Sequence, residues 1–124
     1  MVTFAEGDVV VNIFKKTQDT CFEIRGIDMS LMIHIYYTGK NGSAREFAHE
    51  MVCSGIVERI RSQAGNLRYE YVFPMDESEI LILMDEWVNQ EALNSHHKSP
   101  MMEEIAVLRK KYRLKMRVKR YWSE

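Results

Sequence analysis

The sequence predicts an α+β domain of the ferredoxin-like type, with elements in the order strand, helix, strand, strand, helix, strand. Three observations predict this fold. First, apolar runs with strand character alternate with two runs of helical periodicity. Second, two strand-like runs follow one another directly in the sequence between the two helical runs. Third, the last run alternates apolar with basic residues. This order forms an antiparallel four-stranded sheet with both helices on one face.

The first half of the domain is expected to hold one strand and one helix. Residues 31–37 are strongly apolar and rich in residues that favour strands. Ser43 and Glu46 fit a capping box, and apolar residues then recur at helical spacing through residues 47–60. Gly65 is placed to end this helix in a left-handed conformation.

The second half is expected to hold three strands and a helix. Residues 67–73 alternate as in a half-buried strand, and residues 80–84 are apolar on both faces. A short polar turn is expected after Trp87, before Ser99 and Pro100 begin the next helix. Residues 114–118 alternate apolar with basic side chains and predict a last strand with one face toward solvent.

The apolar character of residues 80–84 also predicts a partner. Helices cover only one face of the predicted sheet, yet this central strand carries apolar residues on both faces. The sheet of a second subunit is the simplest cover for the other face. The sequence therefore predicts a homodimer that forms through the faces of the two sheets.

Composition excludes several other classes of protein. The chain has 124 residues, of which 46% are hydrophobic, and this suits one compact domain. A net charge of −1 gives no general attraction to nucleic acid or membranes, and no apolar run is long enough to span a bilayer. Cys21 and Cys53 have no metal-ligand spacing, and the N-terminus lacks the pattern of a signal peptide. We expect a cytoplasmic protein with reduced thiols.

The N-terminal part of the chain differs from the rest. Residues 9–14 and 21–25 resemble two short strands around a polar connection, and they could form a β-hairpin. We therefore divide the chain into an N-terminal extension, residues 1–28, and a ferredoxin-like domain, residues 29–124.

Five short motifs stand out in the predicted domain: Gly65-Asn66-Leu67-Arg68-Tyr69, Asp85-Glu86-Trp87, Ala92-Leu93, His96 and Ser99-Pro100. They lie between about residues 29 and 118, and the most specific is the spacing of a Trp, a His and a Ser-Pro pair. In these motifs the chain resembles the antibiotic biosynthesis monooxygenase family, and in particular its quinol monooxygenase branch.

The resemblance implies a dimeric α+β barrel with a pocket between each sheet and its helices. Members include oxygenases that use neither metal nor flavin, haem-degrading enzymes and an isomerase, so the fold alone does not choose an activity. Quinol monooxygenase-like members often carry a second His where this chain has Met101. The haem-degrading branch ligates iron with a His near the position of Ala106, which cannot ligate iron.

His96 is the candidate catalytic residue, because an imidazole can accept or donate a proton at neutral pH. The alternative is a structural His that hydrogen-bonds the turn. His97 must point elsewhere and is expected on the surface. Two adjacent His residues without a carboxylate or Cys cluster do not predict a metal site.

The candidate substrate-binding residues are Trp87, Tyr69, Tyr71, His34 and Asn66. Trp87 could form an aromatic wall or anchor the core, and the two Tyr residues could bind a ring oxygen or pack across strands. His34, in the first strand, could line a pocket or be structural, and Asn66 could bind ligand or shape a turn.

The resemblance implies a cofactor-independent monooxygenase that acts on a quinol or an aromatic polycyclic molecule, with dioxygen as second substrate and no cofactor. It also implies that the substrate itself supplies the electrons, so the protein would contribute a base and a dry cavity, and His96 would handle the proton. Two alternatives remain open: an isomerase of a small metabolite on the same scaffold, and a module that binds an aromatic ligand without chemistry.

Overall fold

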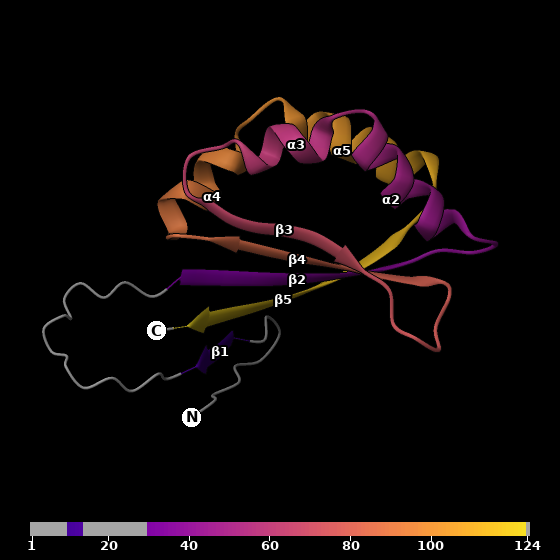
Figure 1. Cartoon of the computed structure of the whole chain (residues 1–124), viewed down its shortest axis with the longest axis horizontal. Coiled ribbons are helices and arrows are strands. Elements are labelled where there is room, and N and C mark those ends of the chain that lie inside the picture. Colours follow the sequence, from indigo (N-terminus) through magenta and orange to yellow (C-terminus); the bar gives the residue numbers. More distant parts are fainter. Residues whose placement is uncertain (1–9, 14–29, 124) are drawn as a thin grey trace, which may run out of the picture.

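The computed structural model describes residues 10–13 and 30–123, and it confirms the predicted ferredoxin-like α+β fold. All four described helices lie on the same face of one sheet (Figure 1). The strands are β1 (Val10–Ile13), β2 (Ser30–Thr38), β3 (Asn66–Val72), β4 (Ile80–Trp87) and β5 (Lys115–Ser123). The helices are α2 (Ser43–Cys53), α3 (Ile56–Arg61), α4 (Gln90–His97) and α5 (Met101–Lys111).

The strand order across the sheet is β1-β5-β2-β4-β3. The pairs β5–β2, β2–β4 and β4–β3 are antiparallel, as predicted, whereas β1 runs parallel to β5 and adds a fifth strand at that edge. The second strand of the predicted N-terminal hairpin, residues 21–25, lies outside the described residues.

The first predicted helix is in fact two helices. Gly55 adopts a left-handed conformation with φ of 87°, and it separates α2 from α3. The expected capping box at Ser43 is also absent, because Gly42 occupies the N-cap position. The carboxylate of Glu79, which is distant in sequence, accepts a hydrogen bond from the Gly42 N–H at 3.0 Å.

The prediction of a polar turn after Trp87 is wrong, because most of the segment between Trp87 and Ser99 forms helix α4. Asn89 is the N-cap of this helix, because its side chain accepts a hydrogen bond from the N–H of Ala92 at 2.9 Å. An Asn at this position is a helix-start signal that the sequence analysis did not use. Helix α4 therefore begins directly beyond β4 and ends with the His pair, so His96 is fixed on a helix rather than on a turn.

Gly65 joins α3 to β3 in the left-handed conformation expected for it, with φ of 87°. Its lack of a side chain also permits a close approach between this connection and α4. A Cβ atom at Gly65 would lie 2.5 Å from the Cβ of Ala92 and 3.0 Å from a methyl group of Val88.

The core lies between the sheet and the helices. The strands contribute alternate residues, on the face of the sheet that meets the helices, and helices α2, α3 and α5 contribute apolar side chains that pack against them. On β3, the Arg61 guanidinium donates two hydrogen bonds, at 3.0 and 2.8 Å, to the carbonyl oxygen of Tyr69. No described strand pairs with the outer edge of β3.

Candidate functional site

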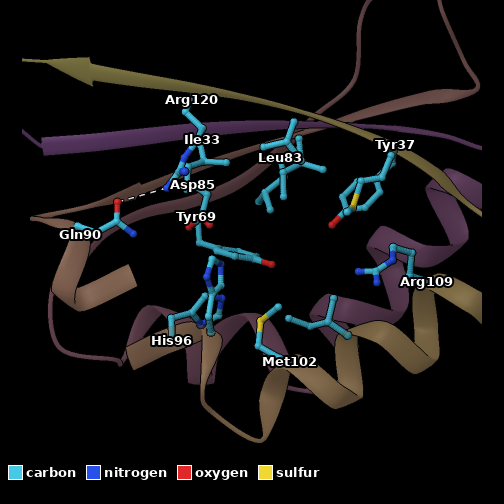
Figure 2. Close-up of a pocket in the computed structure, with 15 residues that line it drawn as sticks. Ile33, Tyr37, Tyr69, Leu83, Asp85, Gln90, His96, Met102, Arg109 and Arg120 are labelled. Atoms are coloured by element: carbon cyan, nitrogen blue, oxygen red, sulfur yellow. Dashed lines mark hydrogen bonds between the residues drawn. The ribbon is translucent and has the colours of Figure 1, made fainter. Parts of the chain in front are cut away.

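A cavity of about 440 Å³ lies between the helix-facing side of the sheet and helices α4 and α5 (Figure 2). Much of its wall is aliphatic and comes from β2, β4, β5 and α5. Its polar side chains are Tyr37, Tyr69, Asp85, Gln90, His96, His97, Arg109 and Arg120.

The strand register arranges the polar groups at the two ends of the cavity. Tyr69, Asp85, Ile33 and Arg120 pair in that order across four strands, so they form one row. Tyr37 lies four residues beyond Ile33 on β2, which places it about 13 Å along the sheet. Figure 2 shows the Arg109 side chain at the Tyr37 end and His96 at the Asp85 end.

Asp85 is the buried carboxyl group of this cavity, with 5% of its surface exposed. The indole Nε1 of Trp87 donates a hydrogen bond to Asp85 Oδ1 at 2.8 Å, and no described residue hydrogen-bonds Oδ2. Burial raises the pKa of Asp85 to about 7, and the bond from Trp87 opposes this rise. Asp85 can therefore take up or release a proton near neutral pH.

His96 is 3% exposed and lies against Trp87, with the ring centroids 4.8 Å apart and the ring planes at 26°. Its Nδ1 is 2.7 Å from Oε1 of Gln63. An amide oxygen only accepts hydrogen bonds, so Nδ1 carries the proton and Nε2 keeps its lone pair. Burial, and to a lesser extent the charge of His97, lowers the pKa of His96 to about 4. The ring is therefore neutral at physiological pH.

The two candidate tyrosines are neighbours on β3, with ring centroids 5.9 Å apart, but only Tyr69 lines the cavity. Burial raises the pKa of both hydroxyl groups, so both remain protonated and can donate hydrogen bonds. The Tyr71 hydroxyl is buried and has no hydrogen-bond partner among the described residues.

The other predicted residues have different positions. Trp87 is fully buried and does not line the cavity, but its indole stacks on His96 and donates a hydrogen bond to Asp85. His34 lies on the opposite face of the sheet, where its ring is 4.6 Å from that of Tyr121. Asn66 bonds the carbonyl oxygens of Arg68 and Glu86, at the irregular start of β3.

Of the predicted residues, the structure places His96 and Tyr69 on the cavity and Trp87 against His96 and Asp85. The cavity also includes four polar residues that the sequence did not single out: Asp85, Tyr37, Arg109 and Arg120. A signal for Asp85 was available, because β4 alternates Leu81, Leu83, Asp85, Trp87 on its buried face. A single carboxyl group in such a series is unusual for a core strand.

The neighbouring residues Met101 and Met102 have different surroundings in the structure. Met102 lines the cavity, whereas Met101 is buried in the core and does not. Met101, at which the resemblance implied a second His in quinol monooxygenase-like members, therefore does not face this cavity.

Within the described residues, no group of three or more His, Cys, Asp or Glu side chains could hold a metal ion. None of the described helices is long and apolar enough to cross a membrane.

The fold and the cavity define a small α+β protein with a partly apolar cavity, one wall of which carries a buried carboxyl group with a raised pKa. Residues 30–107, well over half of the chain, match the model of the antibiotic biosynthesis monooxygenase family. The chain therefore belongs to this family, as its motifs suggested. No curated protein matches it.

Solved structures share the fold at low sequence identity. A protein from Methanosarcina mazei Go1 is 20% identical with a TM-score of 0.67, and the match covers 77% of this chain and 94% of that one. A Bacteroides thetaiotaomicron protein of unknown function, described as a possible oxidoreductase, is 9% identical with a TM-score of 0.67, covering 77% and 99%. SnoaB, a cofactor-independent oxygenase from Streptomyces nogalater, is 14% identical with a TM-score of 0.63, covering 76% and 91%.

Proposed function

We propose that this protein is a cofactor-independent monooxygenase that oxidises a quinol or an aromatic polycyclic molecule with dioxygen. Membership of the monooxygenase family and the likeness to SnoaB support a role of this general type. The observation that carries the proposal is the buried carboxyl group of Asp85, beside Tyr69 and His96, on an otherwise largely apolar cavity.

In this proposal Asp85 takes the proton from a ring hydroxyl group of the substrate. A general base is most effective when its pKa is near the working pH, and the pKa of Asp85 is about 7. His96, which the sequence suggested for this role, has a pKa of about 4 and is the weaker base. Its neutral Nε2 instead accepts a hydrogen bond, and the Tyr69 hydroxyl donates one to a ring oxygen.

The electrons come from the substrate. Loss of a proton leaves an electron-rich ring anion, which passes one electron to dioxygen, and the two radicals combine to form a carbon–oxygen bond. The resulting peroxide anion takes the proton back from Asp85, and the hydroperoxide then loses water and leaves a carbonyl group. For a hydroquinone, one molecule and one dioxygen give one hydroxyquinone and one water, so all atoms and electrons balance.

Oxygen uptake by metal-stripped, flavin-free protein tests the proposal with a panel of hydroquinones, after subtraction of autoxidation. We expect enzyme-dependent uptake that rises with pH as Asp85 ionises around pH 7. Asp85→Asn should lower kcat by about 100-fold, the lower range for loss of a general base. The Asn side chain can still accept the hydrogen bond from Trp87, so the local structure should be retained.

The matched control is Glu86→Gln, the next residue on β4, which lies on the opposite face of the sheet. It removes a carboxylate without changing the cavity, and we expect full activity. If His96→Ala abolishes uptake while Asp85→Asn leaves it unchanged, the proton acceptor is His96 and our assignment is wrong. If no member of the panel gives uptake by folded protein, the monooxygenase proposal fails.

The pair of Asp85 and His96 also favours one second candidate, an isomerase that moves a proton within a small oxygenated metabolite. Two groups with well-separated pKa values can serve proton transfer without any oxidant. Exchange of a substrate C–H for deuterium in anaerobic D₂O, lost in Asp85→Asn, would distinguish this activity from oxygenation.

A further inference from the structure

Arg109 is a half-buried cation at the end of the cavity that lies away from Asp85. Helix α5 presents Met102, Ile105 and Arg109 to the cavity, at spacings that place them on one side of the helix. Figure 2 shows the Arg109 guanidinium directed into the space beside Tyr37. It is near enough to the Tyr37 hydroxyl to offset part of the rise in the pKa of that group caused by burial.

No carboxylate neutralises Arg109 within the described part of the chain. Two acidic residues on or beside α5 have other partners: Glu104 pairs with Arg59 at 2.7 Å, and Glu50 pairs with Lys111 at 2.9 Å. None of the ion pairs between described residues includes Arg109. A guanidinium withdrawn from water gains most from an anion that accepts two of its N–H groups.

We propose that the ligand of this cavity is an aromatic molecule with an anionic group, such as a carboxylate, and that Arg109 and the Tyr37 hydroxyl bind this group. The inference rests on the proposed function, because it assigns the substrate class of the same cavity. The reacting hydroxyl group lies at Asp85, and the anion lies about 13 Å away at the other end. The aliphatic residues between the two ends contact the ring system.

This arrangement also fixes the direction of the ligand. If the anionic group of the ligand lay at the Asp85 end, it would lie beside a carboxyl group that ionises near pH 7, and the two negative charges would repel each other. The cation at the far end therefore selects the orientation that brings the ring hydroxyl to Asp85. Arg120 lies in the row of Asp85 and hydrogen-bonds Gln90 at 3.3 Å, so it provides a control for positive charge at the wrong end.

The test compares two matched probes by anaerobic titration calorimetry at pH 7: 6-hydroxy-2-naphthoate and its neutral counterpart 6-methyl-2-naphthol. We expect the wild-type protein to bind the naphthoate about tenfold or more tightly than the naphthol, a difference typical of a charged hydrogen bond. Arg109→Met should abolish this preference, by raising the Kd of the naphthoate about tenfold more than the Kd of the naphthol. Arg120→Met should retain the preference.

Three results would overturn the proposal: no preference in the wild type, a preference that survives Arg109→Met, or a preference lost only in Arg120→Met. If Arg109→Met binds neither probe, Arg109→Lys decides, because it keeps the charge and should keep part of the preference. Oxygen uptake with neutral quinols but no charge preference would refute this inference alone. A charge preference without uptake of oxygen would refute the monooxygenase proposal alone.

Discussion

The imidazole of His96 is stacked on the indole of Trp87, with centroids 4.8 Å apart, and the same indole hydrogen-bonds Asp85 through its Nε1. On its other side His96 bonds Gln63. One chain of contacts therefore links the segment before β3, helix α4 and the end of β4. Because each ring is held by two neighbours, Asp85 and His96 keep fixed positions beside the cavity.

The first prediction concerns the protonation of His96. We expect NMR titration of the ring nitrogens to give a pKa near 4 and a neutral ring protonated at Nδ1. The unfolded protein binds this proton at about pH 6.5, so the free energy of unfolding should fall as the pH drops from 6.5 towards 4. In His96→Phe, which keeps an aromatic ring on Trp87, this part of the pH dependence should disappear. A pKa near 6.5 in the folded protein would contradict the prediction.

The second prediction concerns Asp85, whose ionisation should lower the free energy of unfolding as the pH rises, whereas His96 lowers it as the pH falls. The pKa of Asp85 rises from 3.8 to about 7 on folding, so the unfolded protein releases this proton first and the folded protein loses stability as the pH rises from about 4 to about 7. Asp85→Asn should therefore unfold at higher urea concentration than the wild type at pH 8. The gain has an upper limit of about 4 kcal/mol, at 1.36 kcal/mol for each pKa unit.

At pH 4 the gain from Asp85→Asn should be small, because this pH is close to the unfolded-state pKa of 3.8 and the folded and unfolded proteins then bind nearly the same number of protons at Asp85. Glu86→Gln serves as the reference, since Glu86 is only half-buried and outside the cavity. A stability difference between Asp85→Asn and wild type that does not change with pH would show that Asp85 ionises normally in the folded protein.

The third prediction concerns Gly65. Gly65→Ala should destabilise the protein by about 2–4 kcal/mol, since a left-handed Ala costs about 1 kcal/mol and the overlap with Ala92 adds about 1–3 kcal/mol. Gly55→Ala is the matched control, because Gly55 has the same φ of 87° but no atom within 4 Å of its added Cβ. Equal losses in urea denaturation of the two variants would mean that the approach to α4 is not tight.

The fourth prediction is the homodimer. The face of the sheet opposite the helices carries half-buried apolar residues that no described helix covers: Met32, Tyr36, Ile80, Ile82 and Met84. We expect light scattering at micromolar concentration to give twice the 14.7 kDa mass of one chain. Ile82→Lys should shift the mass towards that of a monomer, whereas Val107→Lys, on the exposed side of α5, should not. A monomeric wild type would contradict the prediction.

The order of strands and helices could be predicted from the sequence because alternation and helical periodicity are local signals. The break at Gly55 could not, since a left-handed Gly within an apolar helical repeat resembles a tolerated helical Gly. The start of α2 depends on the carboxylate of Glu79, a tertiary contact that no local pattern reveals.

The site was only partly predictable for a related reason. Strand β2 is apolar on both faces, so the sequence did not indicate whether Ile33 and Tyr37 or His34 and Tyr36 would meet the helices. The structure places Ile33 and Tyr37 on the cavity, and His34 on the other face. Arg109 lay within a basic stretch that resembles a solvated surface, and only the packing of α5 on the sheet brings its side chain to the cavity.

The bidentate bond from Arg61 to the Tyr69 carbonyl has a consequence for assembly. An unpaired strand edge can accept a strand from another molecule, and this is a common route to aggregation. On β3, an edge strand of the described sheet, the guanidinium occupies a backbone acceptor that would otherwise be open to such a strand. Addition of a strand from a second copy along β3 is therefore hindered at Tyr69, which favours contact between copies through the sheet face over contact through this edge.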